Sequence, residues 1–415
     1  MWGRSFQRHP EWVVILVGVS AALHVGKMPP AIPVLRETLG VSLLQSGFLL
    51  SLVQLAGMML GLVVGVVADG IGLKRSMLIG LLFLSAAGAL GAFARDPASL
   101  LLLRACEGFG FLLTVMPAPG LIRRLTSASE LPVALGLWGA YMPFGTALAL
   151  GIGPALIGAV GWPTWWLSLA AVSLVMAAWL ILAVAPDPRF RAAPALAGLT
   201  QPAPAVGRAW FMRARSTLAA PGPWLVALCF ALYSGQWLAV IGFLPSVVAQ
   251  RGYSGAAIAG LLALVALVNM IGNIASGRLL QRGVPARCLL YAGFGAMSAG
   301  AALAFADIAW RLSPDLVLAL RYLGLLLFSA VGGMVPGTLF SVAVQVAPNE
   351  ASVSTTVGWM QQLSALGQFL GPPLVAWVAT TVGGWHWTWA ATGILCVLGA
   401  GVAQQIGRQL GHDAR

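Results

Sequence analysis

The stretch Ala22-Leu23-His24-Val25-Gly26-Lys27 recurs, with changes, as Ala231-Leu232-Tyr233-Ser234-Gly235-Gln236, 209 positions later. Further matches follow in the same order along the chain, and their spacing grows slowly: Gly40 with Gly252, Gly65 with Gly277, Arg104 with Arg321, Pro119-Gly120 with Pro336-Gly337, and Gly153-Pro154 with Gly371-Pro372. Such an ordered set indicates a duplicated half that has gained a few loop residues. Duplicated hydrophobic halves are typical of transporters, whose substrate site lies between two rocking domains.

Composition places this duplication in a lipid bilayer. Hydrophobic residues make up 59% of the 415 residues and charged residues only 8%, and the mean hydropathy is +0.91. A helix needs about 20 apolar residues to cross the hydrocarbon core. We predict an all-α membrane protein with twelve transmembrane helices, at residues 12–34, 43–68, 77–94, 98–121, 133–158, 163–185, 223–248, 256–279, 288–306, 315–343, 352–378 and 387–406.

The distribution of Lys and Arg predicts the orientation of these spans. If the N-terminus is cytoplasmic, cytoplasmic segments hold 16 of the 23 basic residues and the opposite side holds four, Arg36, Arg95, Arg251 and Arg311. This asymmetry predicts that both termini are cytoplasmic. We expect a multi-pass protein of a bacterial inner (plasma) membrane. It also accounts for the net charge of +12 without a nucleic acid partner. The first apolar segment has no small-residue cleavage site, so we interpret it as a span rather than a signal peptide.

A composition change near the middle of the chain predicts the domain boundaries. Residues 186–222 are rich in Pro, Ala and Gly and contain five arginines with one acid. We predict an N-terminal six-helix half at 1–185, a cytoplasmic linker at 186–222 and a C-terminal six-helix half at 223–415. The linker is interpreted as a tether, and the alternative is a segment that contacts anionic lipid headgroups through its arginines.

Enzyme chemistry finds no support in the sequence. The four cysteines (Cys106, Cys229, Cys288 and Cys396) lie within or at the edge of spans and do not have metal-ligand spacing. The chain has no phosphate-binding loop, no dinucleotide fingerprint and no HExxH motif. We therefore expect no metal, no cofactor and no enzymatic activity.

Two motifs carry a family resemblance. The segment Gly65-Val-Val-Ala-Asp69-Gly-Ile-Gly72-Leu-Lys74-Arg75 resembles the signature loop of the major facilitator superfamily, and Leu101-x-x-Arg104-x-x-Glu107-Gly108-x-Gly110 resembles that superfamily's fourth-helix motif. Gly70 and Leu73 stand where the loop motif usually has basic residues, and Gln281 replaces the Asp of the second-half copy. The Gly-Pro pairs at 153–154 and 371–372 match the antiporter signature of the fifth helix only in part.

The resemblance extends to one group within the superfamily. Arg104-Ala-Cys-Glu-Gly-Phe-Gly-Phe, followed by Leu-Trp-Gly-Ala-Tyr-Met-Pro143, is similar to the cyanate and nitroimidazole permeases. The resemblance implies the major facilitator fold, with two pseudo-symmetric six-helix halves, alternating access, a monomeric state, and a cavity lined by helices 1, 4, 7 and 10.

The ionisable residues agree with that implied cavity. Charged groups in hydrocarbon are costly and normally face the bundle interior or water. His24 and Lys27 lie in the first predicted helix, Arg104 and Glu107 in the fourth, and Arg321 in the tenth. The repeat partners of His24 and Lys27 are Tyr233 and Gln236 of the seventh helix.

These residues predict a site for a small anion. Guanidinium groups bind carboxylates through two parallel hydrogen bonds. We assign substrate binding to Lys27, Arg104, Arg321, Tyr233 and Gln236. Each has a structural alternative: Arg104 could only neutralise Glu107, Lys27 and Arg321 could extend to the membrane surface, and Tyr233 and Gln236 could link helices.

Proton coupling and gating are assigned to the remaining residues. An anion that draws Arg104 away would leave Glu107 without its partner, and Glu107 would then take up a proton. His24 is the alternative proton carrier. We expect Asp69 to cap the eleventh helix near Ser352, with Lys74, Arg75 and Arg123 or Arg124 completing a cytoplasmic latch.

The predicted function is therefore secondary active transport of a small organic anion, as a proton-coupled symporter. Two other functions stay open, a drug or metabolite efflux antiporter and a membrane sensor that does not transport. The basic cavity argues against the efflux of cationic drugs. The sequence predicts the lipid bilayer, protons and a small anion as partners.

Overall fold

The structure is a computed structural model, and it describes residues 9–127, 130–187, 206–253, 255–307, 313–349 and 352–413. Helices are the only regular secondary structure of these residues. The helices before the linker are α2 (Pro10–Gly26), α3 (Met28–Leu39), α4 (Leu43–Ser51), η1 (Leu52–Gln54), α5 (Leu55–Ile71), α6 (Leu73–Gly91), α7 (Pro97–Val115), α8 (Ala118–Leu125), α9 (Leu131–Gly139) and α10 (Tyr141–Ala183). Those that follow are α11 (Val206–Ala219), α12 (Pro221–Gln250), α13 (Ala256–Leu267), α14 (Asn269–Gln281), α15 (Ala286–Phe305), α16 (Pro314–Gly332), α17 (Met334–Gln345), α18 (Val353–Thr381), η3 (Trp385–Trp387) and α19 (Thr388–Asp413).

Eleven helical segments among the described residues are long and apolar enough to cross a membrane. One of them, α10, has 43 residues, about twice the number that a single crossing needs. Gly161 divides it, because its φ of 81° and ψ of 160° are not helical and are accessible mainly to glycine. The predicted fifth and sixth spans are therefore the two arms of α10, with α9 extending the fifth, and the bundle has twelve crossings.

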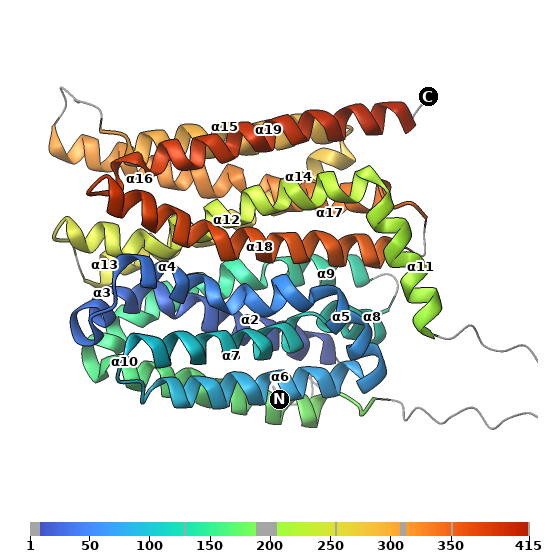
Figure 1. Cartoon of the computed structure of the whole chain (residues 1–415), viewed down its shortest axis with the longest axis horizontal. Helices are drawn as coiled ribbons and strands as arrows, with labels where there is room; N and C mark the ends of the chain where they lie inside the picture. The colour runs from blue at the N-terminus through green and yellow to red at the C-terminus, as the bar shows by residue number, and fades with distance from the viewer. Residues whose placement is uncertain are drawn as a thin grey trace, which may run out of the picture.

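Figure 1 shows how the helices are arranged. The helices run roughly parallel to one another, those of the first half of the chain below and those of the second half above. The end of the bundle that carries α11, at the right of the view, is called the linker end, and the end where α3 joins α4 is called the distal end.

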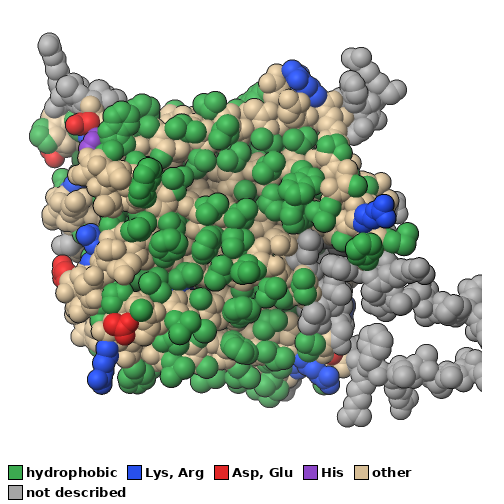
Figure 2. All heavy atoms as spheres, in the orientation of Figure 1, with side chains coloured by type: hydrophobic (Ala, Val, Ile, Leu, Met, Phe, Trp, Pro, Cys, Tyr) green, Lys and Arg blue, Asp and Glu red, His purple; other side chains and the backbone are tan. Residues whose placement is uncertain are grey.

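The outer surface matches a lipid environment. In Figure 2, hydrophobic side chains cover the middle of the molecule, and the visible Lys, Arg, Asp and Glu side chains lie toward its two ends. Large apolar side chains remain exposed on the surface, including Leu182 at 84%, Val397 at 72% and Phe93 at 71%. Because so broad an apolar surface is unfavourable in water, the chain is a multi-pass membrane protein.

Helix packing between the two halves is close at the distal end. The helices α3 and α4 pack against α12 and α18, and α10 packs against α13. A Cβ atom at Gly47 of α4 would lie 2.9 Å from the Cα atom of Pro373 and 3.0 Å from the carbonyl oxygen of Pro372, both in α18. At Gly242 of α12, a Cβ atom would lie 2.8 Å from the side chain of Leu50. Glycine therefore permits the halves to close against each other on this side of the bundle.

The linker region contains a helix at its end. The helix α11 packs against α12 and α18, and its Ser216 hydroxyl lies 3.1 Å from the Ser352 hydroxyl. Residues 188–205, which are 18 of the 37 residues of the predicted linker, lie outside the described residues. The part of the linker from residue 206 onward is thus anchored to the second half by α11.

Candidate functional site: a buried charge cluster

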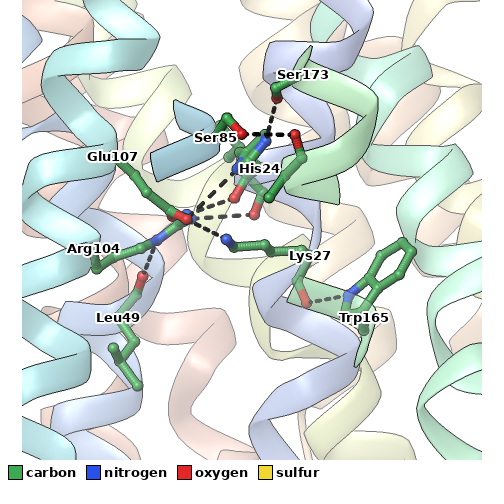
Figure 3. A network of polar contacts seen from close by, with 10 residues as sticks. His24, Lys27, Leu49, Ser85, Arg104, Glu107, Trp165 and Ser173 are labelled. Carbon is green, nitrogen blue, oxygen red and sulfur yellow. Dashed lines mark hydrogen bonds and ion pairs between the residues drawn. The ribbon is translucent and has the colours of Figure 1, made fainter. Parts of the chain in front are cut away.

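Four of the predicted site residues meet inside the first half of the chain, between α2, α3, α6, α7 and α10 (Figure 3). The residues are His24 and Lys27 at the end of α2, and Arg104 and Glu107 of α7. Asp96 begins α7, because its side chain accepts a hydrogen bond from the Ser99 backbone at 2.9 Å. None of the four clustered side chains is more than 2% exposed.

Arg104 is held mainly by backbone carbonyl groups. Its Nε donates to the carbonyl oxygen of Leu49 at 2.9 Å, and its Nη1 donates to that of His24 at 2.5 Å. Its Nη2 donates to Val25 at 3.5 Å. The Val25 carbonyl has no helical partner because Pro29, four residues later, has no N–H group. Pro29 therefore leaves the Val25 carbonyl free to accept a hydrogen bond from Arg104, inside a helical segment that continues to Leu39.

Glu107 is the centre of the cluster. Its Oε2 accepts a hydrogen bond from Arg104 Nη1 at 2.6 Å, and its Oε1 accepts one from Lys27 Nζ. The His24 Nδ1 atom lies 3.6 Å from Oε1 and has no hydrogen-bond partner. The structure thus brings together the predicted ion pair of Arg104 and Glu107 and adds Lys27 as a second cation on the same carboxylate.

The sixth span supplies contacts that the sequence did not single out. The Ser173 hydroxyl lies 2.8 Å from His24 Nε2, and Trp165 Nε1 donates to the Lys27 carbonyl at 3.3 Å. Lys27 Nζ lies 4.7 Å from the centre of the Trp166 ring, a cation–π geometry. All three residues belong to the second arm of α10.

The cluster is closed to water in this structure and carries an excess of positive charge. Lys27 and Arg104 carry two positive charges and Glu107 carries one negative charge, so the sum is +1 when His24 is neutral. The crevice beside Arg104, Glu107 and Trp166 has no space for a water molecule. An uncompensated charge away from water is unfavourable. The cluster is therefore suited to attract an anion.

Tyr233 and Gln236, the repeat partners of His24 and Lys27, form hydrogen bonds within the second half. The Tyr233 hydroxyl accepts a hydrogen bond from Asn269 at 2.9 Å, which leaves its own proton available for donation. Gln236 donates to Leu232 at 2.8 Å and accepts from the Cys396 thiol at 3.3 Å. Among the described residues, neither side chain is bonded to the charge cluster.

Arg321 lies in a different place from the other predicted substrate residues. It lines a cavity of about 210 Å³ with Arg251, Asp307 and His386 at the distal end of the second half. The structure thus divides the predicted cations between two locations, with Lys27 and Arg104 in the first half and Arg321 in the second. The single cavity-lining set that the sequence suggested stays a prediction, and in this structure Arg104 is turned toward α2 and α4.

The predicted latch is arranged around an acid that we did not single out. Asp187, which follows the sixth span, accepts hydrogen bonds from the backbone N–H groups of Lys74 at 3.3 Å and Arg75 at 3.0 Å, and its Oδ1 lies 3.1 Å from Arg124 Nη1. Lys74 Nζ donates to the carbonyls of Ile181, at 3.0 Å, and Val184. The side chain of Asp69 lies outside the described residues, so its predicted contact with the eleventh helix stays a prediction.

Asp187 could have been recognised from two sequence signals. It is the one acid among the linker arginines, and it stands between two prolines directly after an apolar span. An acid at that point lies near the N-terminus of the antiparallel α6, whose free N–H groups favour an anion.

Comparison with known proteins agrees with the fold and the motifs. Residues 14–372 match the family model of the Major Facilitator Superfamily. The "2-nitroimidazole transporter" of Escherichia coli (strain K12) is 25% identical over 399 residues, which cover 93% of this chain and 92% of that protein. The "Cyanate transport protein CynX" of the same organism is 26% identical over 275 residues, 63% of this chain and 64% of that protein.

Solved structures show the same architecture. A bacterial homolog of the human lysosomal transporter Spinster has a TM-score of 0.77 in its inward-facing, occupied conformation and 0.75 in its inward-facing, unoccupied conformation. In both comparisons 97% of each chain is covered, at 15% and 16% sequence identity. The family match, the relatives named as transporters and the shared fold agree: the chain belongs to the Major Facilitator Superfamily and is a transporter rather than an enzyme.

Proposed function

We propose that this protein is a secondary active transporter that moves a small organic anion by alternating access, together with protons. The observation that carries the proposal is the buried cluster in which Lys27 and Arg104 share the single carboxylate of Glu107. We further propose that it acts as a monomer in a bacterial inner membrane with both termini cytoplasmic, since 16 of the 23 Lys and Arg residues fall in segments that the sequence predicts to be cytoplasmic.

The excess charge of the cluster suggests how substrate binding is favoured. An anion that enters beside Lys27 and Arg104 would compensate the second positive charge, and the absence of water would strengthen the attraction. The Arg104 guanidinium suits a carboxylate, which it can bind through two parallel hydrogen bonds. The charge cluster of this structure would then be the state without substrate, in which Glu107 pairs with both Lys27 and Arg104.

Coupling to protons follows because the substrate and Glu107 would compete for the same two cations, Lys27 and Arg104. When an anion takes Arg104 or Lys27 from Glu107, the carboxylate keeps fewer partners and its protonated form becomes more favourable. The anion and the proton would then cross together and leave together. His24, 3.6 Å from Glu107, is the alternative carrier and could pass the proton on through Ser173.

The other predicted residues take secondary roles in this proposal. Tyr233 keeps a free hydroxyl proton and would donate it to substrate from the second half. Gln236 would reach the substrate only after exchanging its bonds to Leu232 and Cys396. Arg321 would act separately, at the distal end. Asp69, Lys74 and Arg75 stay our candidates for the latch, with Asp187 added to them.

A second candidate function is drug efflux. A relative is named as a 2-nitroimidazole transporter, which favours a substrate other than a carboxylate but gives no direction of transport. An efflux protein would exchange protons for the drug, so the direction of coupling separates the two candidates. A membrane sensor would transport neither kind of compound.

The test uses the purified full chain reconstituted into liposomes. Labelled cyanate, acetate, succinate and 2-nitroimidazole are supplied outside, with the external pH equal to or below the internal pH. We expect an anion to accumulate only when the outside is more acidic. If every anion accumulates to the same extent with and without the pH gradient, the symport proposal is contradicted. Transport of 2-nitroimidazole alone would favour the second candidate.

Two variants connect that assay to the cluster. Lys27→Met removes the excess charge, and we expect it to abolish anion accumulation. Arg36→Gln, which removes an exposed arginine of α3, is the matched control and should transport like the wild type. Equal anion transport by the wild type and Lys27→Met would overturn the proposed role of the cluster.

A further inference from the structure

The distal end of the second half contains a polar cavity that the charge cluster does not explain. Its volume is about 210 Å³, and four separate segments contribute to it. Gln250 and Arg251 lie where α12 ends, Asp307 follows α15, and Arg321 belongs to α16. Trp385 and His386 of η3 complete the wall. These segments lie toward the left of the upper group of helices in Figure 1.

Two arginines face this cavity without an anionic partner. Within the described residues, neither Arg251 nor Arg321 has a carboxylate oxygen within ion-pair distance, although Asp307 lines the same cavity. The Nε atom of Arg321 is buried and has no hydrogen-bond partner. A buried N–H group without an acceptor is uncommon in folded proteins, and a bound water or anion is one explanation for it.

The two guanidinium groups line the same cavity, so their like charges repel each other. Burial, together with the positive charge of Arg321, lowers the pKa of Arg251. Like charges that share a half-buried cavity are unfavourable unless an anion lies between them. The cavity has room for about seven water molecules at roughly 30 Å³ each, which is enough for a small organic anion.

We infer that this cavity binds a small carboxylate monoanion between Arg251 and Arg321. Both arginines can present parallel N–H groups to a carboxylate plane. Asp307 contributes one negative charge to the wall, so the cavity has one net positive charge when His386 is neutral, and a monoanion balances it. The inference does not rest on the proposed transport function, because the cavity and the charge cluster have no lining residue in common.

The position of the cavity indicates what such a site would do. It opens at the distal surface, where α3, α4 and α10 close against the second half in this structure. A carboxylate could therefore bind here while the interface between the halves is closed on the same side. The site would hold anions at the distal surface independently of the state of the transporter.

The first experiment measures binding directly. Benzoate and acetate are titrated into the purified full chain in detergent at constant ionic strength, and the heat of binding is recorded. We expect saturable binding of benzoate to the wild type. Since hydrogen bonds to a charged group contribute about 1.5–3 kcal/mol, Arg251→Gln and Arg321→Gln should each weaken it about tenfold or more. Arg321→Lys keeps the charge but loses the two parallel N–H groups of the guanidinium, and it should also weaken binding.

The controls locate the site. Arg36→Gln removes another exposed cation of the distal end and should leave the benzoate affinity unchanged. Arg95→Gln, which removes the exposed arginine between α6 and α7, should also leave it unchanged. Benzoate binding that is lost in Lys27→Met and kept in Arg321→Gln would overturn the inference, as would the absence of saturable binding to the wild type.

A second measurement does not depend on the folding of variants. Butanedione modifies accessible arginines, and the modified positions are identified by mass spectrometry of peptides from the wild type. Benzoate should slow the modification of Arg251 and Arg321 and leave Arg36 unaffected. Equal rates at Arg251 and Arg321 with and without benzoate would show that the anion does not occupy the cavity.

Discussion

Arg104 and Arg321 occupy equivalent positions, each seven residues after the proline that begins its helix, but among the described residues only Arg104 of the two has a carboxylate partner. Glu107 follows Arg104 by three positions, and the residue three positions after Arg321 is Gly324. A Cβ atom at Gly324 would lie 2.7 Å from the carbonyl oxygen of Gly300, because α15 and α16 are in backbone contact there. The close packing of the second half therefore excludes an acid at this position, and the two halves have acquired different chemistry.

The charge balance of the cluster predicts opposite effects of two substitutions on stability. Glu107→Gln leaves Lys27 and Arg104 buried without a counter-charge, and breaking a buried ion pair in this way costs about 3–5 kcal/mol. Lys27→Met leaves the Arg104–Glu107 pair neutral in sum, so we expect unchanged or higher stability. Thermal unfolding of the purified variants in detergent measures both effects. A higher Tm for Glu107→Gln than for Lys27→Met would contradict the charge assignment.

Asp187 is predicted to stabilise the linker end of the first half. Its carboxylate accepts hydrogen bonds from two backbone N–H groups and pairs with Arg124. Asp187→Asn should lower the stability by about 1.5–3 kcal/mol, since hydrogen bonds to a charged group are lost. Tm and the protease sensitivity of the adjacent linker are the measurements, and Glu37→Gln, an exposed acid of the distal end, is the control. An Asp187→Asn variant as stable as the control would remove the assigned role.

Gly72 offers an independent test of the same contact. Its φ of +106° favours glycine, and a Cβ atom there would overlap the Asp187 carboxylate. Gly72→Ala should therefore be destabilising, by about 1–3 kcal/mol for the backbone conformation alone. If Asp187 is the main obstacle, the loss of stability in the double variant with Asp187→Ala will be smaller than the sum of the single losses, which a double-mutant cycle on Tm reveals.

Backbone contact between α12 and α18 predicts a strong position effect for alanine. A Cβ atom at Gly367 would overlap the carbonyl of Ala231, whereas a Cβ atom at Gly401 of α19 would meet nothing within 4 Å. We expect Gly367→Ala to destabilise the protein by about 1–3 kcal/mol through overpacking. Gly401→Ala should be neutral or stabilising by about 1 kcal/mol, because alanine is the better helix former. Similar Tm values for the two variants would show that α12 and α18 are further apart than in this structure.

Closure at the distal end can be tested with a thiol reagent. Ser46 of α4 is fully buried, so a cysteine placed there should react slowly with a maleimide in detergent. Gly47→Val would push α4 away from Pro372 and Pro373, and we expect the labelling rate to rise about tenfold, given an overpacking cost of about 1–3 kcal/mol. All four native cysteines are replaced by serine or alanine beforehand.

The matched control for that measurement is Gly158→Val in the distal part of α10. A Cβ atom at Gly158 meets nothing within 4 Å, so this substitution should leave the labelling rate unchanged. Equal rates for the Gly47→Val and Gly158→Val proteins would show that α4 does not seal the distal side.

The fold was predictable because each span is a long apolar segment bounded by turn residues or charges. All twelve predicted spans correspond to helical segments of the structure, within a few residues at most ends. The turn between the fifth and sixth spans was predicted at 159–162, and the structure places it at Gly161. Helix α11 was not predicted, because arginines interrupt the segment and its apolar residues do not recur at helical spacing.

The site was predictable only in part, for a physical reason. A charged residue inside a span must face protein or water, so the sequence could identify Lys27, Arg104 and Glu107 as inward-facing. The direction of each side chain around its helix depends on packing, and a helix that is apolar on all sides gives little information about it. The separation of Arg321 from Arg104 could not be deduced for that reason. Ser173, Trp165 and Trp166 were missed because similar residues are common in packed spans.

The spacing of Arg104 and Glu107 on one helix also has a consequence for biosynthesis. A charged residue at the centre of a helix costs about 2.5–3.5 kcal/mol during insertion by the translocon, and an acid and a base one turn apart can neutralise each other as α7 enters the bilayer. Lys27 has no such partner on its own helix, and its carboxylate is encoded 80 residues later. Until the fourth span has been synthesised, the ammonium group of Lys27 therefore has no carboxylate partner. The packing of this half can therefore be completed only after two helices that are distant in the sequence have both been made.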